Sequence, residues 1–221
     1  LGTGDVYVKS SGNITLNGSL TSGILASTKG NLNIEIEDGT ISVLNGRYGV
    51  SAFGQGAGAV RVNQMEGNIT SQTGIYTRND GTGSTTIQTA GDVTGIRQYG
   101  IYAINSGGSG DINITQIKGK VLGEIYGMYV SNTGVESATI NTAGQVLGNR
   151  RNGIYVLNQA NTNNLTINQT SGSIEGNTTG ITAVNSGNGT TTINTAGKVI
   201  GNNENGIDVR NNATTTTNLT V

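Results

Sequence analysis

The stretch TINTAGQVLGNRRNGIYVLN (residues 139–158) decides the fold, because it returns nearly unchanged as TINTAGKVIGNNENGIDVRN (residues 192–211). Both copies contain short segments in which apolar and polar residues alternate, which is the period of a strand with one buried face. Gly, Asn and Thr separate these segments, as tight turns require. Each copy therefore predicts three short strands: one is threonine-rich, one begins at a glycine, and one follows a Gly-apolar pair.

The Gly-apolar pair recurs about every 26 residues along the whole chain. A strand this short cannot bury its apolar face alone, but it does so when it stacks on its counterpart one repeat away. Parallel crossover connections are right-handed by strong preference. The sequence therefore predicts an all-β fold, a right-handed parallel β-helix of about 8 turns with three short strands per turn. The glycines of the pair are Gly23, Gly49, Gly74, Gly100, Gly127, Gly153, Gly180 and Gly206.

The composition fits the narrow core of such a solenoid. Hydrophobic residues make up 33% of the 221 residues and charged residues 11%, with 37 glycines and no proline. A thick globular core needs more apolar residues, whereas disorder favours charge and proline, which are scarce here. We therefore expect residues 1–221 to form a single β-helical domain.

The residue types present exclude several kinds of chemistry. The chain has no histidine and no cysteine, so Ser-His-Asp and Cys-His catalysis and thiolate metal sites are impossible. Glu124 and Glu204 share a position in the repeat but lie three turns apart, roughly 14 Å at strand spacing, which is too far for the carboxylate pair of a glycosidase. The net charge of −1 creates no field that favours nucleic acid. We expect no enzymatic activity, no metal site, no cofactor and no nucleic-acid partner.

A finer pattern makes the true repeat a pair of turns, about 53 residues long. The apolar residue of the threonine-rich segment lies alternately four and five positions before the next glycine, as in Ile87 to Gly91 and Ile114 to Gly119. The inward position two residues earlier alternates in size, which close packing in a thin core favours. Its members are Thr85, Ile112, Ala138, Leu165, Thr191 and Leu219.

One position of the repeat, five residues after the anchor glycine, is occupied by asparagine on six turns. By strand parity this column points inward. Stacked amides can bond to one another and to turn backbone, so we expect a structural role. The column is Asn79, Asn105, Asn132, Asn158, Asn185 and Asn211.

Tyrosines and arginines gather on the middle turns, on the outward side of the strand after the anchor and in the turn before it. One interpretation is that aromatic residues favour strands and stack on their neighbours, beside an ordinary solvated turn. The other is a protein-binding face, because Tyr and Arg dominate interface energetics. The candidate receptor-binding face is Tyr76, Arg78, Arg97, Tyr99, Tyr102, Tyr126, Tyr129, Arg150, Arg151 and Tyr155.

The two quoted stretches resemble the passenger repeats of bacterial autotransporters, which are exported right-handed β-helices. More narrowly, the pattern IN[TQ]xxGxVxGxxxxGIYxxN is similar to that of the Bartonella angiogenic factor passengers. The resemblance implies a virulence factor secreted across the outer membrane or displayed at the cell surface. It also implies a host cell-surface receptor of the vascular endothelial growth factor type as partner, and a precursor with a signal peptide and a C-terminal membrane barrel. We expect residues 1–221 to be a passenger fragment of such a precursor.

Three other functions remain open. The same fold would serve an adhesin for host matrix or cell surface, which would bind without triggering receptor phosphorylation. It would also serve a polysaccharide-acting enzyme, which would generate new chain ends in acidic glycans. A purely structural stalk would have no specific partner.

Overall fold

The computed structural model describes residues 1–106, 108, 110–159, 162–212 and 219–220, and in strand β23 it describes the backbone alone, so the side chain of Leu219 lies outside it. All regular structure within these ranges is β-strand, and all pairing is parallel. No helical segment among them has the length and apolar character needed to cross a bilayer.

The threonine-rich segments and their counterparts in the early turns form one sheet of nine strands along the molecule. Each strand pairs with its counterpart one turn away, in the register that the repeat predicts, for example Ile112 beside Ala138. The strands, in sheet order, are β1 (Val6–Ser10), β4 (Leu32–Ile36), β6 (Val60–Gln64), β8 (Thr85–Thr89), β11 (Ile112–Gln116), β14 (Ala138–Thr142), β17 (Leu165–Gln169), β20 (Thr191–Thr195) and β23 (Leu219–Thr220).

The other two segments of each turn form a second sheet of fourteen strands, bent at a corner into two rows. The first row contains β2 (Ile14–Leu16), β9 (Asp92–Gly95), β12 (Lys120–Gly123), β15 (Gln145–Gly148), β18 (Ser173–Gly176) and β21 (Lys198–Gly201). The second row contains β3 (Ser22–Thr28), β10 (Tyr99–Asn105), β13 (Tyr126–Asn132), β16 (Ile154–Asn158), β19 (Ile181–Asn185) and β22 (Ile207–Asn211). Strands β5 (Thr40–Gly54) and β7 (Asn68–Asn79) run through the corner and belong to both rows.

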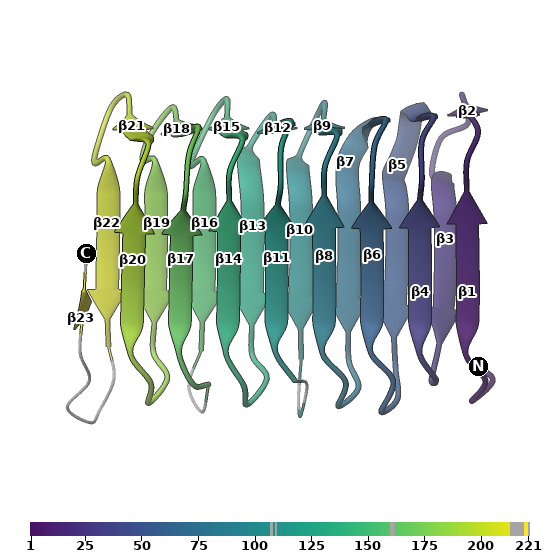
Figure 1. Ribbon diagram of the computed structural model, residues 1–221, viewed down its shortest axis with the longest axis horizontal. Helices are drawn as coiled ribbons and strands as arrows, with labels where there is room; N and C mark the ends of the chain where they lie inside the picture. The colour runs from purple at the N-terminus through teal and green to yellow at the C-terminus, as the bar shows by residue number, and fades with distance from the viewer. Residues whose placement is uncertain (107, 109, 160–161, 213–218, 221) are drawn as a thin grey trace.

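The stacked turns form a right-handed β-solenoid of about 8 turns with roughly 26 residues per turn, as the repeat predicts. In Figure 1 the nine-stranded sheet runs upward in front, the second row runs downward behind it, and the chain advances from right to left. Three strands per turn are present except in the second and third turns, where β5 and β7 each merge two of them.

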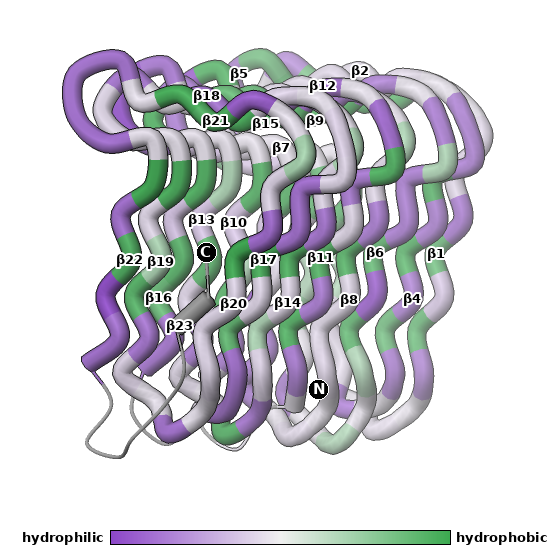
Figure 2. Tube along the Cα trace, turned by 60° about the vertical axis from the view of Figure 1, so that its left-hand side comes forward, coloured by the Kyte–Doolittle hydropathy of each residue, from purple (hydrophilic) through white to green (hydrophobic). Residues whose placement is uncertain are grey.

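The core is a stack of single side chains from each turn. Ile87, Ile114, Ile140 and Ile167 occupy one inward column of the nine-stranded sheet and are completely buried. Burying one such side chain is worth about 1.5–3 kcal/mol. The neighbouring inward column alternates in size from Thr85 to Thr191, also fully buried, as the two-turn repeat predicts. Figure 2 shows the matching alternation of apolar and polar positions along the strands.

The alternating turn length has a backbone explanation. In the five-residue turns the closing glycine has a positive φ, at Gly39 (83°), Gly67 (76°), Gly119 (80°) and Gly172 (77°), and in the four-residue turns it does not. The extra residue is thus accommodated in the left-handed region, where glycine carries no steric cost. At Gly67, Gly119 and Gly172 a buried glutamine lies three residues before the glycine, whereas at Gly39 this position is Ile36. The amide nitrogen of Gln116, for example, donates to the carbonyls of Gly119 (2.9 Å) and Gln145 (3.0 Å).

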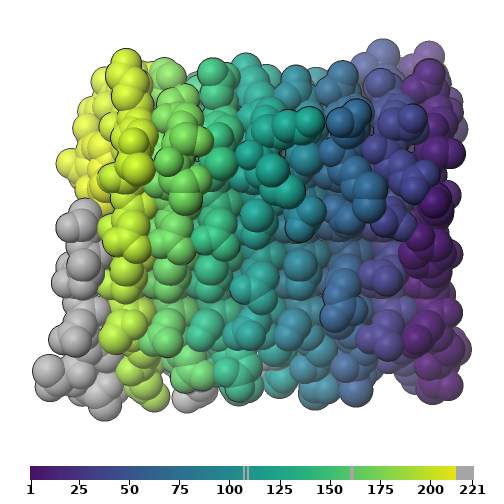
Figure 3. All heavy atoms as spheres, viewed as in Figure 1, coloured from purple at the N-terminus to yellow at the C-terminus, as the bar shows by residue number. Residues whose placement is uncertain are grey.

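The outward side of the nine-stranded sheet is mostly polar. Figure 3 views the molecule from this side and shows each turn as one band of side chains beside the next. Asparagine amides form an outer ladder here, from Asn194 to Asn168 (2.8 Å) and from Asn168 to Asn141 (2.9 Å). The aromatic residues of the candidate face lie on the other sheet.

A candidate binding face of tyrosines and arginines

The candidate face lies on the outer side of the second row, over β7, β10, β13 and β16. Strand parity decides this, because the residues on either side of Tyr102 in β10, Ile101 and Ala103, fill the core. In-register pairing then places Tyr76, Tyr102, Tyr129 and Tyr155 in one outward column.

A second column stands beside the first, where the chain leaves the corner. Tyr99 pairs in register with Tyr126, at the starts of β10 and β13. Tyr48 occupies the corresponding position in β5, opposite Ser22 of the preceding turn. Seven of the eight tyrosines therefore lie on one face; Tyr7, in β1, does not. We call this set the tyrosine ladder: Tyr48, Tyr76, Tyr99, Tyr102, Tyr126, Tyr129 and Tyr155.

The rings of the tyrosine ladder are in continuous contact. Tyr48 stacks on Tyr76 with centroids 4.7 Å apart, and Tyr129 stacks on Tyr155 at 5.3 Å. The two columns also contact each other, as in Tyr99 and Tyr102 at 4.7 Å. Aromatic pairs with centroids 4.5–7 Å apart contribute about 0.5–1.5 kcal/mol beyond their buried area. The ladder is thus an ordered aromatic surface before any partner arrives.

Packing between the rings hides part of this surface. Tyr76 points outward but is only 8% exposed, because Tyr48 and Tyr102 pack against its ring and Phe53 meets it edge-on. The other ladder tyrosines are half-buried. A partner would therefore meet ring edges and hydroxyl groups more than ring faces.

Burial also changes the acidity of the ladder. It raises the pKa of Tyr102 to about 12, helped by the neighbouring Tyr99 and Tyr129. Burial likewise raises the pKa of Tyr76, Tyr99 and Tyr129. These phenols therefore keep their proton, and with it a hydroxyl that can donate a hydrogen bond, to a higher pH than an exposed tyrosine does.

Arginines surround the ladder, and several are held by neighbouring groups. Nε of Arg78 lies 2.8 Å from both carboxylate oxygens of Asp80. Nε of Arg150 lies 2.7 Å from Oε1 of Glu124, and hydrogen bonds from Asn149 and Arg150 lower the pKa of that carboxyl group. The side chain of Arg150 is nevertheless 73% exposed, and exposed pairs of this kind stabilise a protein by only about 0–1 kcal/mol.

The remaining arginines lie against rings or in solvent. The guanidinium carbons of Arg47 and Arg151 lie 5.8 Å from the ring centroid of Tyr48 and 6.0 Å from that of Tyr126. Arg97 is exposed in the turn before β10. The tyrosine ladder together with these cations is hereafter the Tyr/Arg face; its arginines are Arg47, Arg78, Arg97, Arg150 and Arg151.

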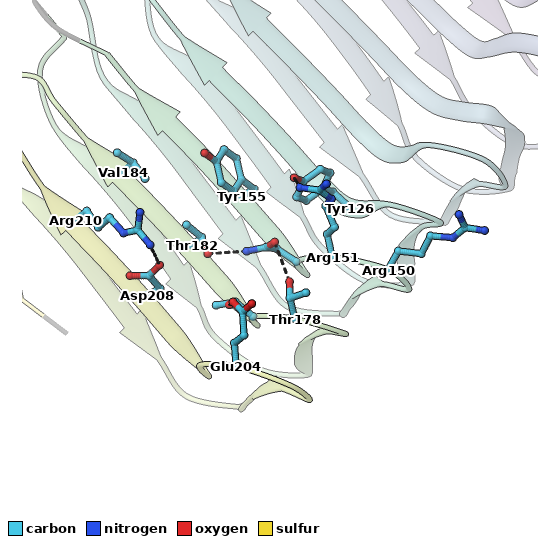
Figure 4. A pocket seen from close by; sticks show the side chains of 12 residues that line it. Tyr126, Arg150, Arg151, Tyr155, Thr178, Thr182, Val184, Glu204, Asp208 and Arg210 are labelled. Atoms are coloured by element: carbon cyan, nitrogen blue, oxygen red, sulfur yellow. Dashed lines mark hydrogen bonds and ion pairs between the residues drawn. The ribbon is translucent and has the colours of Figure 1, made fainter.

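The ladder ends in a groove of about 400 Å³. Tyr155 is the last ring of its column, and Thr182 and Asp208 follow it on β19 and β22. Figure 4 shows the step from ring to small side chain, with the ion pair of Asp208 and Arg210 (2.8 Å) beyond it. The floor is a fixed polar network, in which the Asn152 amide donates to Thr182 (2.6 Å) and accepts from Thr178 (3.2 Å).

The groove also brings two carboxylates into one lining, Glu204 and Asp208. Each has a partner within the chain: Asp208 pairs with Arg210, and Glu204 accepts a hydrogen bond from the Thr179 hydroxyl (3.2 Å). Glu124, on the far side of Arg150, is not part of the lining. Among the described residues, no three acidic side chains gather into a group that could hold a metal ion.

The asparagine column lies inside the solenoid, apart from the Tyr/Arg face. Five members are completely buried and Asn211, near the C-terminal end, is half-buried. The Asn132 amide donates to Asn158 (3.0 Å) and the Asn158 amide to Asn185 (3.1 Å). The same amides also donate to loop carbonyls, such as that of Asn163 (3.1 Å).

The candidate face chosen from the sequence left out Tyr48 and Phe53 of the aromatic surface, and the groove was not predicted. Tyr48 has the same offset from its anchor glycine as Tyr99 and Tyr126, so the repeat alone could have placed it. Phe53 lies in the outward column of Arg78, and its contact with Tyr76 depends on side-chain direction. The groove arises where tyrosine gives way to threonine in one column, a change that the aligned repeats display.

Comparison of the chain with protein-family models, with curated proteins and with solved structures finds no match.

Proposed function

We propose that this chain is a non-catalytic binding protein that engages a host cell-surface receptor through the Tyr/Arg face. The observation that carries the proposal is the row of seven tyrosine rings in continuous contact, flanked by exposed arginines. Stacking alone would account for the rings, but not for the arginines around them. Tyr and Arg together are the side chains most enriched where binding energy concentrates in protein interfaces.

The order of the ladder supports a binding role energetically. Binding usually costs about 0.5–1.5 kcal/mol for each flexible side chain that becomes fixed. Here the rings of Tyr102 and Tyr129 are already held by their neighbours, at 5.2 Å from each other. A partner that covers them therefore gains contact area at low entropic cost.

Charge supports a partner with an acidic surface. The net charge of the chain is −1, so the cations on the Tyr/Arg face are a local feature. Arg97, Arg150 and Arg151 are exposed at one corner, and Glu124 is the carboxylate between them. Complementary charge of this kind speeds encounter and selects the partner more than it adds affinity.

The resemblance to autotransporter passengers supplies the class of partner. In line with it, the protein is secreted or displayed outside the bacterium, and the receptor is of the vascular endothelial growth factor type. Receptor engagement would then promote endothelial growth. The β-solenoid is compatible with this role, and it equally suits an adhesin, which would use the same face without signalling.

Titration of the purified chain on an immobilised ectodomain of this receptor tests the proposal. The variant Tyr102→Ala/Tyr129→Ala/Arg150→Ala should bind about tenfold more weakly or worse, the loss expected for one or more interface anchors. The matched control Arg61→Ala/Thr139→Ala/Thr166→Ala changes outward residues of the nine-stranded sheet and should bind like the native chain. Circular dichroism of both variants verifies the fold. Unchanged binding of the first variant would remove the Tyr/Arg face from the proposal.

A cell assay separates the receptor ligand from the adhesin. Endothelial cells treated with the native chain should show receptor phosphorylation, and cells treated with the weakened variant should not. Binding without phosphorylation would favour the adhesin and contradict the signalling role.

A further inference from the structure

We propose that the groove at the C-terminal end of the tyrosine ladder binds one pyranose ring of a carbohydrate. The inference goes beyond receptor binding and does not depend on it. It starts from the end of the tyrosine column: Tyr129 and Tyr155 stack with centroids 5.3 Å apart and nearly parallel planes, while the next two positions hold Thr182 and Asp208.

The groove has the size and place for one more ring in the stack. Neighbouring strands are about 4.8 Å apart, so a flat ring seated over Thr182 lies one strand beyond Tyr155. That spacing is close to the 5.3 Å centroid distance between Tyr129 and Tyr155, the last two rings of the column, whose planes are nearly parallel. The volume of about 400 Å³ lies in the range of small-ligand sites.

The wall opposite Tyr155 favours a sugar over an aromatic side chain. It is formed by the ion pair of Asp208 and Arg210, with Glu204 beside it. An aromatic ring seated there would cover these charges without offering them hydrogen bonds, which is costly. Sugar hydroxyls both donate and accept, so they can bond to the carboxylate and to the guanidinium group. The C–H groups on one face of the same sugar carry a partial positive charge, which the negative face of the Tyr155 ring attracts.

The floor and rim are arranged for this orientation. Thr182 is 6% exposed, and its hydroxyl already accepts a hydrogen bond from the Asn152 amide. The rest of its short side chain therefore forms the floor beneath the bound sugar ring. Arg151 stands at the other rim, near the hydroxyl of Tyr126 (3.4 Å). Polar groups thus surround the seat at its edge, beside the ring of Tyr155 (Figure 4).

Saturation-transfer NMR on the full chain tests the inference. The probes are cellohexaose, chitohexaose, hexagalacturonate, a sialylated biantennary N-glycan, and N-acetyltyrosinamide as the aromatic alternative. At least one glycan should receive saturation, strongest on the axial ring protons of one sugar face. The same sample, analysed for shortened oligosaccharides, distinguishes binding from cleavage.

Two variants locate the site. Thr182→Tyr extends the stack by one ring and fills the groove, and Tyr155→Ala removes the stacking face; each should weaken glycan binding about tenfold or more. Thr139→Tyr, the same change on the outward face of the nine-stranded sheet, should bind like the native chain. Binding of N-acetyltyrosinamide with no glycan bound, no binding of any glycan, or native affinity in Thr182→Tyr would each overturn the inference.

Discussion

Hydrogen bonds between buried side-chain amides link members of the asparagine column on successive turns. Asn158 shows how: its nitrogen donates to Asn163 and Asn185, and its oxygen accepts from Asn132. A buried polar group costs free energy unless it is paired, and here one residue type satisfies its neighbours in both directions along the axis. These hydrogen bonds therefore let polar side chains fill part of the core, in a chain that has few apolar residues.

We predict that Asn158→Ala lowers the free energy of unfolding by about 2–3 kcal/mol, because a fully buried residue with three hydrogen bonds is lost. Asn168→Ala removes an amide from the outer ladder on the nine-stranded sheet, where water can replace its bonds. It should cost less than about 1 kcal/mol. Urea denaturation of the two variants measures the difference, and equal losses would contradict the structural role of the inner column.

The ladder should also make stability depend on pH in alkaline solution. The pKa of Tyr102 is raised to about 12 in the folded chain, above the value near 10 of an unfolded chain. The unfolded state therefore loses its proton first, and the stabilisation, fully present below about pH 10, decreases as pH rises toward 12. Tyr76, Tyr99 and Tyr129 act with the same sign.

Urea unfolding between about pH 9 and about pH 11.5 should therefore show a falling free energy of unfolding. Tyr102→Phe, which cannot ionise, should fall less steeply than the native chain. Identical slopes would mean that the ladder does not exclude water from Tyr102.

At the scale of elements, each long turn contains one residue more than a short turn. A closing glycine in the left-handed conformation accommodates that extra residue. Gly119 has φ of 80°, and a Cβ added there would lie 2.7 Å from the carbonyl oxygen of Gly91 in the turn below. The turn thus needs glycine for its own conformation and for the close approach of its neighbour.

Gly119→Ala should lower the free energy of unfolding by about 2 kcal/mol, from the left-handed conformation and the backbone contact together. Gly12→Ala is the matched control, because nothing lies within 4 Å of an added Cβ there. Its effect should stay within about 0.5 kcal/mol. Thermal and urea unfolding compare the two, and a harmless Gly119→Ala would show that the turn can relax into another conformation.

Element arrangement was largely predictable from the spacing of glycines and the alternation of apolar residues. Register, turn number and the inward columns follow directly from the repeat. A one-residue shift in the pairing of two strands would turn the apolar side chains of one of them out of the core. The merging of two segments in β5 and β7 was not predictable, since those early turns depart from the two-turn repeat. The sequence shows Gln64, Gln116 and Gln169 at long turns, but the hydrogen bonds from their amides to the carbonyls of the closing glycines were not predicted.

At the scale of the whole molecule, the solenoid holds side chains at strand spacing on fixed faces. Sequence offsets alone could place Tyr76, Tyr102, Tyr129 and Tyr155 in one column. Side-chain packing decides the rest: it covers Tyr76 and leaves the groove beyond Tyr155. The two outer faces also differ in kind: tyrosines and arginines gather on one, and asparagines and threonines predominate on the other from β8 onward.

The chain has no cysteine, so a single introduced thiol reports on one position without background. Ser131→Cys places it in β13 at the centre of the Tyr/Arg face, and Thr139→Cys places it in β14 on the outward side of the other sheet. The decisive measurement is the rate of maleimide labelling of each variant with and without the receptor ectodomain. The receptor should slow labelling of Ser131→Cys several-fold and leave Thr139→Cys unchanged. Protection of Thr139→Cys with Ser131→Cys still reactive would contradict the assignment of the Tyr/Arg face.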